Sequence, residues 1–161
     1  MTKRIIKWDQ KIRLYWKNYL LQSLLASLSV FMLLWLLHMQ NLIVVASIGA
    51  TAFVVFTMPQ DVTAKPRNVV GGHLVGFACG SLCALIPHQT LTFSAMVYSL
   101  AVGSSILIMV TIDTEHPPAA GTALGVVIAG FSTAMMFSIV ASILMLAIIH
   151  HILKPYLKEL I

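Results

Sequence analysis

Charged residues are scarce in this chain. They make up 9% of its 161 residues, whereas 59% of the residues are hydrophobic. A soluble domain averages about 25% charged residues. So few charges cannot cover the outside of a water-soluble fold, because an extended apolar surface would remain in contact with water. The composition excludes an ordinary soluble domain and predicts an integral membrane protein.

Cysteine and clustered catalytic residues are also lacking. The two cysteines, Cys79 and Cys83, are four residues apart and therefore share one helical face, where they make a poor disulfide. Two thiols are too few for a structural metal site. The apolar stretches contain no metal-binding cluster and no Ser-His-Asp arrangement. We therefore interpret the cysteines as packing residues and expect neither a cofactor nor enzymatic activity.

The few charges that exist fall into four short segments, at 3–17, 61–67, 113–115 and 154–159. The three stretches between these segments carry no charge, and each is about twice as long as a membrane-spanning helix of about 20 residues. The pattern predicts an all-α, polytopic membrane helix bundle with six embedded segments. We expect these segments near 19–37, 42–58, 69–86, 91–111, 117–131 and 134–153.

An even number of crossings between charged segments places all four segments on one side of the membrane. They contain all ten Lys and Arg residues, so this side is expected to be cytoplasmic. We predict a multi-pass protein of the cell inner membrane with both termini in the cytoplasm, because no transit peptide is recognised. Residues 1–17 read as an amphipathic helix on the membrane surface, 18–153 as the transmembrane domain and 154–161 as a short tail. No feature indicates nucleic-acid binding.

The second and fifth segments are short, and their sequences are related. Gly-Ala-Thr-Ala-Phe at 49–53 resembles Ala-Gly-Thr-Ala-Leu at 120–124, at an offset of 71 residues. The same offset relates the starts of the first and fourth segments. Three crossings per half would give the halves opposite orientations, as in the inverted repeats of many transporters. The alternative is two ordinary short spans with small residues at their contacts.

The start of each short segment is a candidate anion site. The fifth helix is expected to begin at Pro117 or Pro118, with His116 just before it, because proline is tolerated in a first helical turn. Ser47 or Thr51 is expected to cap the second helix. A helix N-terminus offers free N–H groups and a partial positive charge. Two such starts, meeting inside the bilayer, would hold a small anion.

Three motifs carry a resemblance to a known family. They are Ser-Ile-Gly-Ala-Thr-Ala at 47–52, Pro-Arg-Asn followed by Gly-Gly-His at 66–73, and Glu-His-Pro-Pro at 115–118. In this order they resemble the HPP family of integral membrane proteins, named for its His-Pro-Pro triplet, over residues 15–155. That family is thought to include plastid and cyanobacterial nitrite transporters, so the resemblance implies transport of a small anion, with nitrite leading. Ala119-Ala120 and Glu115 depart from the family pattern.

These observations predict a membrane channel or transporter for a small inorganic anion, with nitrite as the leading candidate and the lipid bilayer as its surroundings. The alternative is a non-transporting scaffold or anchor for a partner protein. Six thin segments enclose little space, so we expect a homo-oligomer. The predicted substrate-binding residues are His116, Pro117, Pro118, Gly121, Thr122, Ser47, Gly49, Thr51, Arg67, Asn68 and His73.

Four of these predicted residues are open to a second interpretation. Arg67 either attracts anions to the cytoplasmic mouth or only follows the positive-inside rule, and Asn68 is expected to cap the third helix. His73 either faces a cavity or bonds a nearby carbonyl, and His116 is either a donor in the site or a turn residue. The Gly72, Gly76 and Gly80 ridge predicts close helix packing, within or between subunits.

Overall fold

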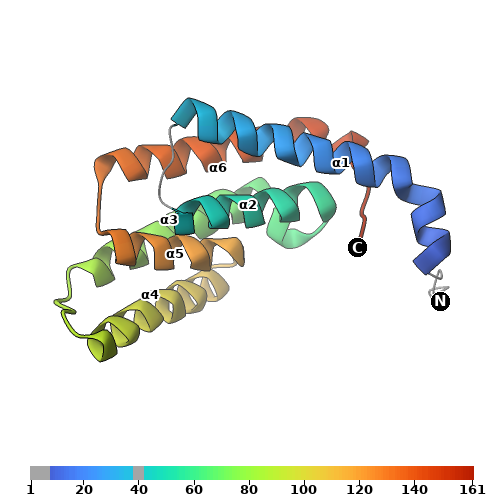
Figure 1. The fold of residues 1–161 in the computed structure, drawn as a ribbon. Helices are drawn as coiled ribbons and strands as arrows, with labels where there is room; N and C mark the ends of the chain where they lie inside the picture. The colour runs from blue at the N-terminus through green and yellow to red at the C-terminus, as the bar shows by residue number, and fades with distance from the viewer. Residues whose placement is uncertain (1–7, 38–41) are drawn as a thin grey trace.

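The computed structural model describes residues 8–37 and 42–161. Their regular structure consists of six α-helices and two short 3-10 helices (Figure 1). An all-α bundle is thereby confirmed, and every predicted segment corresponds to one helix. In chain order the elements are α1 (Trp8–Leu37), α2 (Leu42–Thr57), η1 (Val62–Ala64), α3 (Pro66–Ala84), α4 (Leu91–Thr111), α5 (Pro118–Ala129), α6 (Thr133–Leu153) and η2 (Lys154–Tyr156).

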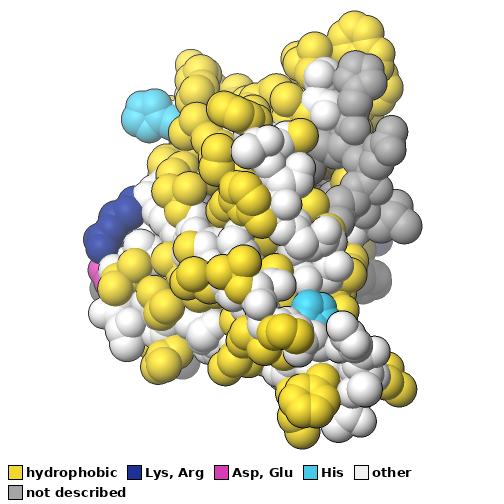
Figure 2. Space-filling model, turned by 90° about the vertical axis from the view of Figure 1, so that its left-hand side faces the viewer, with side chains coloured by type: hydrophobic (Ala, Val, Ile, Leu, Met, Phe, Trp, Pro, Cys, Tyr) yellow, Lys and Arg dark blue, Asp and Glu magenta, His cyan; other side chains and the backbone are white. Residues whose placement is uncertain are grey.

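Consecutive helices run in opposite directions, so the connections alternate between the two ends of the bundle (Figure 1). The end that holds the α2–α3 connection also holds the α4–α5 connection and the C-terminal segment. Here the Leu160 N–H donates to the Thr57 carbonyl (3.0 Å) and the Gln60 N–H to a Glu159 carboxylate oxygen (3.0 Å). The charged segments at 61–67, 113–115 and 154–159 thus gather at one end, as their spacing predicted. Figure 2 faces the opposite end, where apolar and uncharged groups dominate and a basic group appears at the edge.

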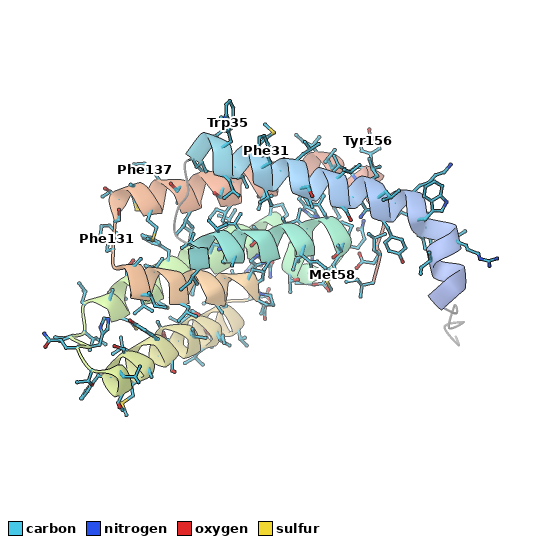
Figure 3. All side chains as sticks on the ribbon, viewed as in Figure 1. Phe31, Trp35, Met58, Phe131, Phe137 and Tyr156 are labelled. Carbon is cyan, nitrogen blue, oxygen red and sulfur yellow. The ribbon has the colours of Figure 1, made fainter. Side chains whose placement is uncertain are left out.

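The outer surface is apolar along three long helices. Trp35 on α1 is 67% exposed and Phe137 on α6 is 68% exposed, and both project outward (Figure 3). Segments Ile12–Leu37, Leu91–Thr111 and Thr133–Tyr156 are long and apolar enough to cross a membrane. Such a surface is stable against lipid and unstable against water. The short apolar helices α2 and α5 lie between these long helices.

Helices α3 and α5 approach closely because α3 presents glycine to α5. A side chain at Gly76 would overlap the carbonyl oxygen of Ala119, and a Cβ atom at Gly80 would lie 2.6 Å from the Ala123 carbonyl oxygen. The glycine ridge is therefore a helix contact within the chain. This contact brings the Gly-Gly-His end of α3 against the His-Pro-Pro end of α5.

The helix boundaries agree with most of the sequence predictions. Helix α5 begins at Pro118 with Pro117 at its cap, and it ends at Gly130, whose φ of 79° stops the helix. Helix α1 is continuous from Trp8, so residues 8–17 belong to the same helix as the first span. The predicted surface location of that segment stays a prediction. Its residues 1–7, and the predicted turn at 38–41, lie outside the described residues.

Candidate functional site

His73 lies two turns into α3 and is completely buried. Its imidazole lies between α2 and α5. The glycines just before it leave room for the α4–α5 connection, since Cβ atoms at Gly71 and Gly72 would meet Thr114 and His116. The Nε2 atom is 2.8 Å from the Thr51 hydroxyl on α2, and the Nδ1 atom is 2.8 Å from the Thr122 hydroxyl on α5. His73 therefore joins the two short helices, and its second interpretation, a bond to a carbonyl, is not what these contacts show.

His116 is the second buried imidazole, and it stands just before the two prolines that open α5. Its Nδ1 atom is 2.7 Å from the carbonyl oxygen of Thr63 in η1, and its Nε2 atom is 3.1 Å from the Thr51 hydroxyl. A carbonyl oxygen only accepts hydrogen bonds, so Nδ1 carries the hydrogen. The ring centroids of His73 and His116 are 5.0 Å apart.

Ser47 completes the group from one turn before Thr51 on α2. Its hydroxyl donates to the Pro118 carbonyl (2.6 Å) and lies 2.8 Å from the Thr122 hydroxyl. Thr51 in turn donates to the Ser47 carbonyl (3.0 Å). We use the name His–hydroxyl cluster for Ser47, Thr51, His73, His116 and Thr122. All five are buried, so the predicted meeting of Thr51 and Thr122 in the interior occurs in the fold.

The short 3-10 helix η1 fixes the carbonyl that His116 contacts. Asp61 caps this helix, and its carboxylate accepts from both the Thr63 hydroxyl (2.7 Å) and the Thr63 N–H (2.8 Å). These two hydrogen bonds lower the pKa of Asp61, which lies in the α2–α3 connection. The cap holds Thr63 in place, and Thr63 in turn orients His116.

The expected helix start at Ser47 to Thr51 is wrong. Helix α2 already begins at Leu42, so both hydroxyl residues lie in its interior, where backbone N–H groups are used within the helix. The start of α5 is also poor in free donors. Pro117 and Pro118 have no N–H, and the N–H groups of Ala119 and Ala120 donate to the carbonyls of residues 116 and 117. Donors at this site therefore come from side chains.

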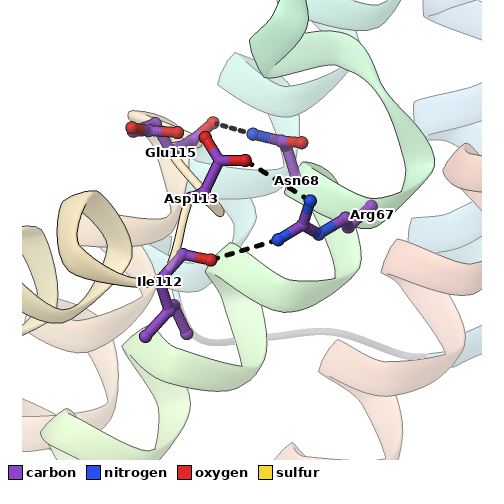
Figure 4. A network of polar contacts seen from close by, with 5 residues as sticks. All are labelled: Arg67, Asn68, Ile112, Asp113 and Glu115. Atoms are coloured by element: carbon purple, nitrogen blue, oxygen red, sulfur yellow. Dashed lines mark hydrogen bonds and ion pairs between the residues drawn. The ribbon is translucent and has the colours of Figure 1, made fainter.

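Arg67, Asn68 and the α4–α5 connection form a polar network at the charged end (Figure 4). The Arg67 guanidinium lies 3.4 Å from the Asp113 carboxylate and donates to the Ile112 carbonyl (3.2 Å). Asn68 donates to the Glu115 carbonyl (3.2 Å), next to His116. The predicted cap role of Asn68 is wrong, because Lys65 occupies the cap and Asn68 lies in the first turn of α3. Arg67 and Asn68 lie outside the cluster, but their hydrogen bonds hold the α4–α5 connection, which carries His116, against α3.

The remaining predicted residues are spread around the cluster. Gly121 packs against Ser47, since a Cβ atom there would lie 3.4 Å from the serine Cβ. Pro117 lines a groove of about 340 Å³ that runs along α4 and reaches His116. Gly49 faces away, into a surface groove of about 620 Å³ between α1 and α2. Gly49 is thus not brought to the cluster.

Sequence reasoning missed three polar contributors. The Thr63 carbonyl left no trace in the sequence, because any residue supplies a carbonyl. Gln22 of α1 is buried and donates to the Phe56 and Lys158 carbonyls, and a lone amide in an uncharged span was a usable signal. His150 of α6 is buried and contacts the Pro59 carbonyl (2.9 Å). Gln22 and His150 thus join α1 and α6 to backbone carbonyls at the charged end of the bundle.

Within residues 8–37 and 42–161, no three His, Cys, Asp or Glu side chains lie close enough together to hold a metal ion. Two imidazoles and three hydroxyls are groups that exchange hydrogen bonds and protons.

The fold and the cluster together define a polytopic membrane protein with a buried polar centre. The HPP transmembrane region matches residues 11–156, and the chain belongs to this family of membrane proteins. The confirmed resemblance covers nearly the whole described bundle, including all five cluster residues.

Two transmembrane proteins of Dictyostelium discoideum are similar to this chain. One is 31% identical over 106 residues, which is 62% of this chain and 37% of the relative. The other is 32% identical over 108 residues, which is 63% of this chain and 35% of the relative. The chain thus spans little more than a third of each relative's length. No solved structure matches this chain.

Proposed function

We propose that this protein is a channel or transporter for a small inorganic anion, and that nitrite is the anion to test first. The observation that supports this function is the His–hydroxyl cluster, five polar side chains buried where the two short helices meet. Polar groups inside a membrane bundle are costly and mark solute pathways. The choice of nitrite rests on the resemblance to a family thought to include nitrite transporters.

The chemistry of the cluster suits a small anion. Hydroxyl and imidazole N–H groups, which here bond one another and nearby carbonyls, can exchange these partners for anionic oxygens without placing a permanent charge in the bilayer. The positive end of the α5 dipole lies at the same place. The solute passes unchanged, so no enzymatic conversion is involved.

Arg67 belongs to the cytoplasmic mouth in this proposal. It is exposed and close to Asp113, and an exposed pair of this kind contributes little to stability. The guanidinium instead raises the local concentration of anions. Arg67→Gln should therefore lower flux chiefly at low salt, because the field of an exposed charge is screened over about 10 Å at 0.1 M.

We further propose that all six helices are embedded in the cell inner membrane, with the charged end and both termini in the cytoplasm. The gathering of basic residues at one end supports this orientation. An inverted repeat is supported by the Ser47–Pro118 contact, whose partners are separated by the same 71 residues as the two related motifs. We also propose a homo-oligomer.

Nitrite flux into liposomes containing the purified protein tests the function. Flux should exceed that of empty liposomes, and His116→Ala should reduce it several-fold, because the loss of a buried hydrogen-bond partner costs about 1–3 kcal/mol. His151→Ala is the matched control, since His151 is exposed on α6. Wild-type protein that moves neither nitrite nor another small anion would favour the scaffold alternative.

A further inference from the structure

The His–hydroxyl cluster contains fewer hydrogens than its contacts require. Each hydroxyl supplies one hydrogen, and each neutral imidazole supplies one N–H, so the five side chains supply five. They take part in seven contacts of 2.6–3.1 Å with one another and with three carbonyl oxygens. Seven separate hydrogen bonds would need seven hydrogens. Two contacts therefore lack a hydrogen of their own while both imidazoles are neutral.

The carbonyl contacts show where the first missing hydrogen belongs. A carbonyl cannot donate, so Thr51 gives its hydrogen to the Ser47 carbonyl and His116 gives its Nδ1 hydrogen to the Thr63 carbonyl. Thr51 then has no hydrogen left for the Nε2 atom of His116, 3.1 Å away. A proton on that Nε2 would complete the contact, with the Thr51 oxygen as acceptor.

The space and the electrostatics allow one added proton. The Thr51 oxygen has two lone pairs, which suffice to accept from both His73 and His116. A second proton would place two like charges on rings whose centroids are 5.0 Å apart, inside a medium that screens charge poorly. The geometry therefore favours the uptake of one proton by the pair of imidazoles.

Among the residues that the structure describes, no carboxylate contacts the imidazoles to balance this charge. The groups that His73 and His116 meet are the hydroxyls of α2 and α5, the Thr63 carbonyl, and each other. Asp61 is engaged with Thr63, and Asp113 is close to Arg67 at the exposed end. The remaining nearby acid, Glu115, offers its backbone carbonyl to Asn68. A buried cation without a partner is strongly disfavoured, whereas a bound anion would supply the missing charge.

We propose that the cluster takes up one proton together with each anion, so that the protein moves the two as an electroneutral pair. The proton binds the free Nε2 of His116, and the anion provides the counter-charge. This inference rests on the proposed function and adds the proton as a co-transported ion. Both species cross together, so neither a covalent change nor an oxidant is needed.

Calorimetry of nitrite binding tests the proposal, with the full-length protein in lipid nanodiscs. In buffers of different ionisation enthalpy, the measured binding enthalpy should vary linearly, with a slope close to one proton taken up per anion. His116→Gln should lower the slope towards zero while retaining some binding, since the amide keeps hydrogen-bonding capacity. His151→Gln should leave the slope unchanged.

Liposome flux gives a second measurement. An inside-negative potential, set with valinomycin and a potassium gradient, should leave nitrite uptake unchanged once the uptake of empty liposomes is subtracted. Binding with zero slope, or uptake slowed by the potential, would overturn the proton pairing and leave anion transport standing. Absence of both binding and flux would instead contradict the proposed function, and the pairing with it.

Discussion

Thr51 is the residue on which the polar centre depends most. Its hydroxyl contacts both imidazoles and the Ser47 carbonyl, so three contacts meet at one oxygen. Removal of this hydroxyl would leave two ring nitrogens without a partner.

Thr51→Val should therefore impair both stability and flux. The two side chains have nearly the same shape, so the change removes hydrogen bonds without creating a large cavity. Stranding buried partners costs about 1–3 kcal/mol, and we expect a clear drop in melting temperature and a flux loss at least as large as that of His116→Ala. Thr57→Val is the control, because the Thr57 hydroxyl is exposed and bonds only the Phe53 carbonyl of its own helix. If the two variants lose equal amounts of melting temperature and flux, the Thr51 hydroxyl does not have the central role proposed for it.

Side chains of the site were predictable from sequence, whereas the backbone groups were not. Ser47, Thr51, His116 and Thr122 were expected near one point, because motif and offset marked them, whereas His73 was left open between a cavity and a carbonyl bond. The Thr63 carbonyl, which fixes the tautomer of His116, has no counterpart in the residue types. The residue types also gave no sign that the first N–H groups of α5 are used in turns at the two prolines. These features arise from local backbone geometry.

At the scale of elements, charges and prolines located most helix ends. Pro118 opens α5, and Gly130 closes it, as the sequence indicated. The start of α2 was misplaced, because the apolar residues before Ser47 carry no sign that distinguishes an extended entry from a helix. The tight packing of α3 on α5 was visible as a glycine ridge, but the partner helix became known only from the fold.

Gly76→Ala should weaken the bundle at this contact. Even one added carbon at this position overlaps the Ala119 carbonyl, so α3 and α5 must separate. Overpacking of this kind costs about 1–3 kcal/mol, and separation would also pull His73 away from Thr122. Thermal unfolding in detergent measures the effect. Gly103→Ala is the control on α4, where nothing lies within 4 Å of the new carbon, and it should be neutral or slightly stabilising. An unchanged melting temperature for Gly76→Ala would show that the helices are not in contact there.

At the scale of the whole molecule, charge segregation determines the arrangement of helices. Six antiparallel helices bring three separate charged segments to one end, and hydrogen bonds from Gln60 to Glu159 and from Arg67 to Ile112 tie them together. The apolar exterior and the buried polar centre reverse the pattern of a soluble protein. Three helices are long enough to span a bilayer by their own length and composition. Whether the shorter α3 also crosses decides the full topology.

Helix α3 separates Gln60 from Gln89, so labelling at these positions tests the crossing. Its 19 residues extend about 28 Å, close to the hydrocarbon thickness of about 30 Å. Single substitutions Gln60→Cys and Gln89→Cys place thiols at exposed positions on either side, while the native Cys79 and Cys83 are buried. With a membrane-impermeant maleimide, the cysteine at 89 should react in intact cells. The cysteine at 60 should react only after the inner membrane is permeabilised. Reaction of both from the same side would remove α3 from the membrane, and the opposite pattern would place the basic end, and both termini, outside the cytoplasm.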